Sequence, residues 1–161
     1  RALRQAECLL VESGYLSPIA LVTSHAGKIT VVDATLAFVS PESKGAFAAL
    51  LHRWAAEGAT EIIMITESWC LADEDGSKGI REEFSKSGKL PVVMDHKDKR
   101  EIISVSASNP NEQVILLKEF GRDDHGWPTR SEKDPMILHG KVGMSTLVGS
   151  FAGFWPAKAR A

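Results

Sequence analysis

The sequence predicts an α+β fold: a single, mainly antiparallel sheet of five strands with two main helices. Three observations support this class. Residues 19–33 and 101–120 each contain two apolar, β-branched runs around turn-forming residues, which indicates two hairpins. Between them, residues 41–57 repeat apolar side chains at helical spacing. The apolar run at residues 62–65 indicates a buried central strand within residues 60–71.

The N-terminal elements are a helix and a hairpin. Residues 2–13 predict a helix, because apolar side chains recur on one face and Gly14 follows as a stop. Residues 19–24 and 28–33 predict the strands of the first hairpin, in whose turn Gly27 can take a positive φ.

The second helix has a complete start signal. Ser40 supplies an N-cap hydroxyl, and Pro41 stands at the first helical position. The helix is expected to continue to residue 57 and to pack one apolar face on the sheet. That face consists of Phe47, Leu50, Leu51 and Trp54.

The remaining chain contains a long charged stretch, a hairpin and a tail. We predict one domain over residues 1–128, with an inserted loop at 73–100 before the hairpin at 101–120. Residues 129–161 form a C-terminal extension that packs on the domain or on a partner, and residues 136–139 suit a further short strand. The order helix, hairpin, helix, strand, insertion, hairpin, tail resembles the profilin or roadblock type of architecture, which implies no activity.

Two motifs resemble an uncharacterised bacterial and phage group of small α+β domains. The first is the strand end T-E-S-W at residues 66–69. The second is the run D-H-K-D-K-R-E at residues 95–101, which opens the next strand. The resemblance implies no activity, so it assigns no catalytic role to any residue.

The composition limits the classes of function. The formal charge is −2, so the chain lacks the basic footprint of a general nucleic-acid binder. The apolar stretch at residues 142–155 contains three glycines and is too short to span a membrane. Cys8 and Cys70 fit no metal-site spacing, which predicts reduced thiols in a cytoplasmic protein. No cofactor motif occurs, and we expect neither a cofactor nor a metal.

Glu67 and Trp69 form the first candidate site. Residues two apart on a strand share a face, and a carboxylate beside an apolar indole suits a general base or a ligand site. The other interpretation is that Trp69 covers the core while Glu67 forms an ion pair with Lys99 or Arg100.

The second candidate cluster follows the long charged stretch. Asp95, His96 and Asp98 offer carboxylates and an imidazole within four residues. Neighbouring lysines and Arg100 neutralise them, so a solvated turn is favoured over a metal site. If the cluster meets the end of the central strand, the catalytic residues are Glu67, His96 and Arg100.

Charged and aromatic side chains elsewhere are expected to contact a ligand or partner. Residues 121–127 form either an interaction loop or a plain turn, and the aromatic tail suits a docking surface. The expected contact residues are Trp69, Asp95, Asp98, Arg122, His125, Trp127, Phe154 and Trp155.

Three functions follow from these features. The preferred one is a small accessory binding module that contacts a protein partner or forms a homo-oligomer, because no catalytic sequence motif occurs. The alternative is a hydrolase or metal-assisted nuclease that uses the catalytic residues named above together with Asp95. The weaker alternative is a small-molecule sensor with Trp69 lining a pocket.

Overall fold

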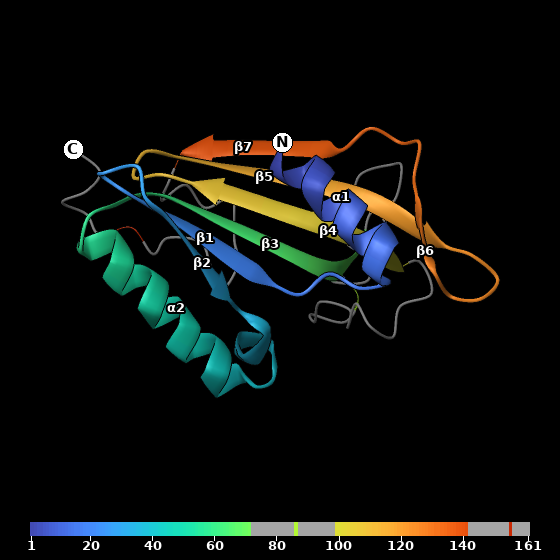
Figure 1. Cartoon of the computed structure of the whole chain (residues 1–161), viewed down its shortest axis with the longest axis horizontal. Helices are drawn as coiled ribbons and strands as arrows, with labels where there is room; N and C mark the ends of the chain where they lie inside the picture. Colours follow the sequence, from blue (N-terminus) through green and yellow to red (C-terminus); the bar gives the residue numbers. More distant parts are fainter. Residues whose placement is uncertain (72–85, 87–98, 142–154, 156–161) are drawn as a thin grey trace.

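The computed structural model describes residues 1–71, 86, 99–141 and 155, and its fold is α+β with an antiparallel sheet, as the sequence predicts (Figure 1). Within these residues the elements, in chain order, are α1 (Ala2–Ser13), β1 (Ile19–Ser24), β2 (Ile29–Asp33), the 3-10 helix η1 (Thr35–Phe38), α2 (Pro41–Ala56), β3 (Ala59–Leu71), β4 (Lys99–Ser108), β5 (Glu112–Arg122), β6 (Pro128–Arg130) and β7 (Met136–Lys141).

The sheet has more strands than the five predicted. Its order is β2-β1-β3-β4-β5-β6, and β7 also pairs with β5, so the described sheet has seven strands and curls into a half-barrel. β5 is long enough for both late strands: β7 pairs with its residues 112–117 and β6 with its residues 120–122. The prediction of five strands is therefore wrong, because part of the predicted C-terminal extension continues the sheet.

β3 is the central strand, with the β1–β2 hairpin on one side and the β4–β5 hairpin on the other. Its apolar run is buried as predicted, since Ile62, Met64 and Ile65 are at most 5% exposed. Ile62 and Met64 pack in the cluster under α2, whereas Ile63 and Ile65 pack in the cluster under α1. A strand covered by a helix on each face needs consecutive apolar residues instead of alternation.

α2 covers one face of the sheet. Ser40 Oγ accepts a hydrogen bond from the Ser43 backbone N–H at 3.1 Å, and Pro41 begins the helix, as the sequence predicts. Phe47 and Leu51 are buried in the α2 cluster, where each contributes roughly 1.5 to 3 kcal/mol before entropy is subtracted. Neither α1 nor α2, the two described α-helices, is long and apolar enough to cross a membrane.

Trp155 packs in the same cluster as α2. It is 1% exposed, and its indole Nε1 donates a hydrogen bond to Ser108 Oγ at 3.1 Å. The sequence predicts that this side chain contacts a partner. The structure places it in the core instead, where a large aromatic side chain buries much apolar area.

Candidate functional site

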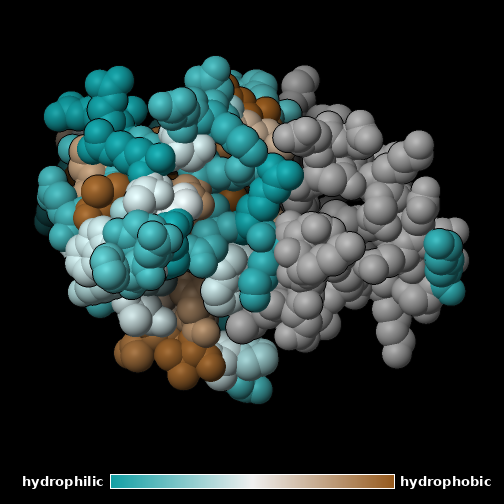
Figure 2. Space-filling model, turned by 90° about the vertical axis from the view of Figure 1, so that its right-hand side faces the viewer, coloured by the Kyte–Doolittle hydropathy of each residue, from teal (hydrophilic) through white to brown (hydrophobic). Residues whose placement is uncertain are grey.

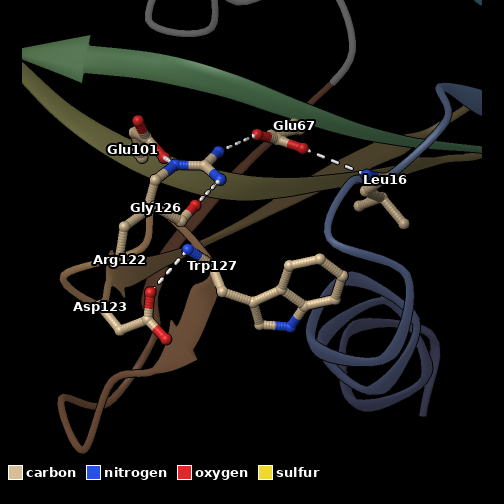
Figure 3. Close-up of polar contacts among 7 residues, drawn as sticks. All are labelled: Leu16, Glu67, Glu101, Arg122, Asp123, Gly126 and Trp127. Atoms are coloured by element: carbon tan, nitrogen blue, oxygen red, sulfur yellow. Dashed lines mark hydrogen bonds and ion pairs between the residues drawn. The ribbon is translucent and has the colours of Figure 1, made fainter.

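β3 and β5 bring Glu67 and Arg122 together (Figure 3). Glu67 Oε1 accepts a hydrogen bond from Arg122 Nη2 at 2.9 Å, and Glu67 Oε2 accepts one from the Leu16 backbone N–H at 3.1 Å. Both carboxylate oxygens are therefore engaged. The interpretation of Glu67 as half of an ion pair is confirmed, but its partner is Arg122 and not Lys99 or Arg100.

Arg122 uses all three guanidinium nitrogens in this arrangement. Nη2 bonds Glu67, Nε donates to Glu101 Oε2 at 2.7 Å, and Nη1 donates to the Gly126 carbonyl at 3.0 Å. The guanidinium carbon also lies 5.4 Å from the Phe120 ring centroid, within cation–π range. Because these donors lie in one rigid plane, they set the relative positions of β3, β4 and the turn after β5. We call Glu67, Glu101 and Arg122 the ion-pair clamp.

The turn at residues 123–127 is closed by its own hydrogen bonds. Asp123 Oδ1 accepts from the backbone N–H groups of His125 at 2.9 Å and Trp127 at 2.8 Å. The Trp127 indole Nε1 donates to the Val11 carbonyl of α1 at 2.8 Å. The plain-turn interpretation therefore fits this segment, and Trp127, a predicted partner contact, attaches the turn to α1.

Gly14 allows the Trp127 ring to lie against the end of α1. Its φ is +80°, and a Cβ added there would lie 2.9 Å from two carbons of the Trp127 ring. Any other residue at this position would adopt a disfavoured backbone conformation and would also clash with the indole.

Arg100 lies on the opposite face of the sheet from Glu67. The β3–β4 register sets Arg100 opposite Cys70, and cross-strand partners share a face. Cys70 is three residues from Glu67 along β3, so their side chains point to opposite faces. The predicted catalytic set therefore does not assemble between Glu67 and Arg100. The other predicted site residues Asp95, His96, Asp98 and Phe154 lie outside the described residues.

Arg100 belongs to a second charged cluster. Its Nη1 donates to Glu119 Oε1 at 2.6 Å, and Lys133 Nζ lies 3.0 Å from Glu119 Oε2. Burial alone would raise the pKa of Glu119, but the bonds and charges of Arg100 and Lys133 outweigh it and hold that pKa below its usual value. Burial, aided by the Glu119 charge, raises the pKa of the Cys70 thiol. Cys70 is thus a protonated thiol at neutral pH and not an activated nucleophile.

An apolar groove opens between α1 and the β1–β2 hairpin. Its volume is about 540 Å³, within the roughly 300 to 1,000 Å³ of typical ligand pockets. Its walls are mainly apolar, and α1 adds polar side chains. The lining includes Arg4, Cys8, Leu9, Leu21, Val31 and Ile65. Arg130 Nη2 donates to the Cys8 sulfur at 3.2 Å, which ties α1 to β6. Trp69, predicted to line a pocket, is not part of this wall.

β2 borders the groove as an edge strand of the described sheet. Val31 stands opposite Leu21 of β1, and Leu21 also lines the groove. Ile29 is two residues from Val31 and so shares its face. Ile29 and Val31 are 60% and 65% exposed, which leaves apolar surface beside the groove without cover.

Apolar exposure continues from β2 into the residues that follow it. Leu36, Phe38 and Val39 are exposed as well, so residues 29–39 hold five of the twelve large apolar side chains exposed in the described chain. Figure 2 shows apolar surface at the lower end of the molecule, where η1 and the start of α2 lie in Figure 1. Such a concentration is typical of a contact surface.

Neither the search for metal-binding clusters among the described residues nor the comparison with known proteins assigns a function to the chain. In the part of the chain that the structure describes, no three His, Cys, Asp or Glu side chains gather closely enough to hold a metal ion. No protein family, curated protein or solved structure matches the chain. The resemblance to a bacterial and phage group therefore stays a prediction, and function must be argued from the geometry.

Proposed function

We propose that this chain is a small, non-catalytic interaction module that binds an extended apolar segment of a protein. The segment pairs with the open edge of β2 and places apolar side chains in the groove. The observation that carries the proposal is Val31, which is 65% exposed on an edge strand and also lines the groove. Cys8 and Cys70 are free thiols, which suits a reducing compartment such as the cytoplasm.

Strand addition combines two sources of affinity. An edge strand offers backbone N–H and C=O groups to an incoming strand, and pockets beside it select alternate side chains. β2 offers such an edge, since β1 is its one partner strand in the described sheet. The groove offers the pocket, because every second side chain of an added strand would lie on the face of Ile29 and Val31.

The ion-pair clamp argues against the hydrolase or nuclease alternative. A general base has to accept a proton from its substrate, but both Glu67 oxygens already accept hydrogen bonds. Arg122 likewise donates to three acceptors, so a substrate would have to compete with these contacts for either charge. These contacts support a stabilising role for the two residues.

A small-molecule sensor is the second candidate, because the volume and apolar lining of the groove also suit a compact ligand. Trp69 would take no part in it, since the groove is lined by other residues. Because an edge strand contributes Val31 to the lining, an extended segment is favoured over a small molecule, and experiment can separate the two candidates.

Two probes distinguish the candidates. The protein-segment probe is a synthetic peptide of alternating threonine and valine with a lysine at each end, and the small-molecule probe is decanoate. We expect the peptide to shift the backbone amide NMR signals of residues 29–33 and of α1 in a saturable way. Val31→Lys should abolish these shifts, because a charged side chain would replace the apolar one that contacts the peptide.

Ile137→Lys is the matched control. Ile137 lies on β7, which pairs with β5 on the far side of the described sheet, and is 64% exposed, close to the 65% of Val31. This variant should bind the peptide as the unsubstituted chain does. Peptide shifts that map to β7, or no shifts at all, would refute the proposal. Saturable decanoate shifts in the groove without peptide binding would establish the sensor instead.

A further inference from the structure

The geometry points to a second copy of this chain as the occupant of the β2 edge, paired antiparallel through β2 itself. This inference rests on the proposed function and specifies its partner. The pairing is centred on Thr30, so that β2 of one copy runs beside β2 of the other in opposite directions. It would join the two sheets into one continuous sheet.

Among the strands that the structure describes, β2 has a neighbour on one side alone. Ile29, Thr30, Val31 and Asp33 are exposed, and Val32 is half-buried. The antiparallel register with β1 uses one side of the strand, and no other strand of the described sheet covers the opposite side. The strand also lacks a charge or proline between its ends, which are the usual devices that keep edge strands apart.

The side chains of β2 are self-complementary in this register. With Thr30 opposite Thr30 of the second copy, Ile29 stands opposite Val31 of the second copy, and the same pair forms again on the other side of the axis. Apolar β-branched pairs and Thr–Thr pairs are both favourable cross-strand neighbours. The exposed Ile29 and Val31 would therefore cover each other on the groove face.

The charges at the ends of β2 fit the same arrangement. In this register Lys28 stands opposite Val32 of the second copy and Asp33 opposite Gly27, so no like charges face each other. The register centred on Val31 is less favourable, because it sets the apolar Ile29 opposite Asp33.

Pairing would also bring an apolar side chain of the second copy to the groove. Val31 forms part of its wall next to the open edge. In the pair, Ile29 of the second copy would stand beside Val31 and place its apolar side chain at the groove. At each groove, Val31 of one copy would then meet Ile29 of the other. Five residues make a short contact, so we expect a reversible monomer–dimer equilibrium.

Sedimentation velocity over a concentration series tests the inference. We expect a concentration-dependent dimer that Val31→Lys dissociates and Ile137→Lys leaves intact. A dimer that survives Val31→Lys, or that Ile137→Lys dissociates, would overturn it. A monomer at every concentration that still binds the threonine–valine peptide would exclude the second copy and leave the proposed function standing. A monomer that binds no peptide would remove both.

Cross-linking tests the register with less dependence on stability. Thr30→Cys and Val31→Cys are each placed in a Cys8→Ser, Cys70→Ser background and treated with a short bismaleimide. Directly opposite Cβ atoms in a strand pair lie about 4.5 to 5.5 Å apart. Thr30→Cys should therefore form covalent dimers faster than Val31→Cys. Faster reaction at position 31, or equal slow reaction at both, would refute this register.

Discussion

Arg122 Nη2 bonds Glu67 Oε1 at 2.9 Å and so joins the end of β5 to β3, although 55 residues separate the two in the chain. The same guanidinium reaches Glu101 on β4 and the Gly126 carbonyl in the following turn. One side chain therefore aligns three consecutive strands of the sheet. Glu67, the strongest site candidate in the sequence, is held in this alignment.

Arg122→Met should destabilise the fold by about 1 to 3 kcal/mol, because it leaves Glu67 and Glu101 half-buried without their cation. The matched control is Arg53→Met, which breaks an exposed i,i+4 pair with Glu57. Fully exposed pairs of that kind contribute little to stability, because solvent screens the two charges. Urea unfolding of both variants provides the comparison. Equal losses would mean that the clamp is no stronger than a surface pair.

Gly14→Ala should destabilise the fold more than Gly27→Ala. Both glycines have positive φ, so alanine costs about 1 to 2 kcal/mol at either position. Gly27 has no neighbour near an added Cβ, whereas Gly14 faces the Trp127 ring, which adds roughly 1 to 3 kcal/mol of overpacking. Combining each change with Trp127→Ala should remove this difference. A difference that persists would place its origin outside the indole contact.

Trp155→Ala should cost about 3 to 5 kcal/mol, as for a large aromatic side chain truncated in a core. Trp69→Ala is the control, because Trp69 is 42% exposed and its loss should cost less than half as much. Thermal or urea unfolding measures both. A small effect at Trp155 would show that the end of the chain does not stabilise the sheet.

Glu119→Gln should change how stability depends on pH. Because the pKa of Glu119 is lowered by Arg100 and Lys133 in the folded state, its ionised form stabilises the fold above the unfolded pKa, near 4.5. This stabilisation is lost as the pH falls through the lower, folded pKa. The difference in unfolding free energy between the unsubstituted chain and Glu119→Gln should be full at neutral pH and should shrink as the pH falls below 4.5 through the folded pKa. A constant difference over this range would contradict the ion-pair assignment.

Local patterns in the sequence predicted much of the fold. The helix at 2–13 and the first strand at 19–24 match the observed α1 and β1, because helical periodicity, β-branching and glycine stops are encoded within a few residues. The predicted number of strands is too low because the sheet continues beyond β5. β6 has only three residues, and its pairing depends on how far β5 extends, which no local pattern states.

The candidate site was predicted less well, because its contacts depend on register. The sequence predicts Lys99 or Arg100 as the ion-pair partner of Glu67, since both residues open the strand that follows the long charged stretch. The observed register sends Arg100 to the other face, while Arg122 reaches back to Glu67 from the end of β5. The groove was missed for a related reason: the apolar residues of β2 indicate a strand, but not that its outer edge has no neighbour.

The ion-pair clamp has a consequence for the lifetime of the folded chain. Its bonds join positions 21 and 55 residues apart, so we expect it to close only after β3, β4 and β5 have found their register. Contacts that form after the transition state for folding affect the rate of unfolding and leave the rate of folding unchanged. The loss of about 1 to 3 kcal/mol expected for Arg122→Met should therefore appear as roughly 5- to 150-fold faster unfolding, with the rate of folding nearly unchanged.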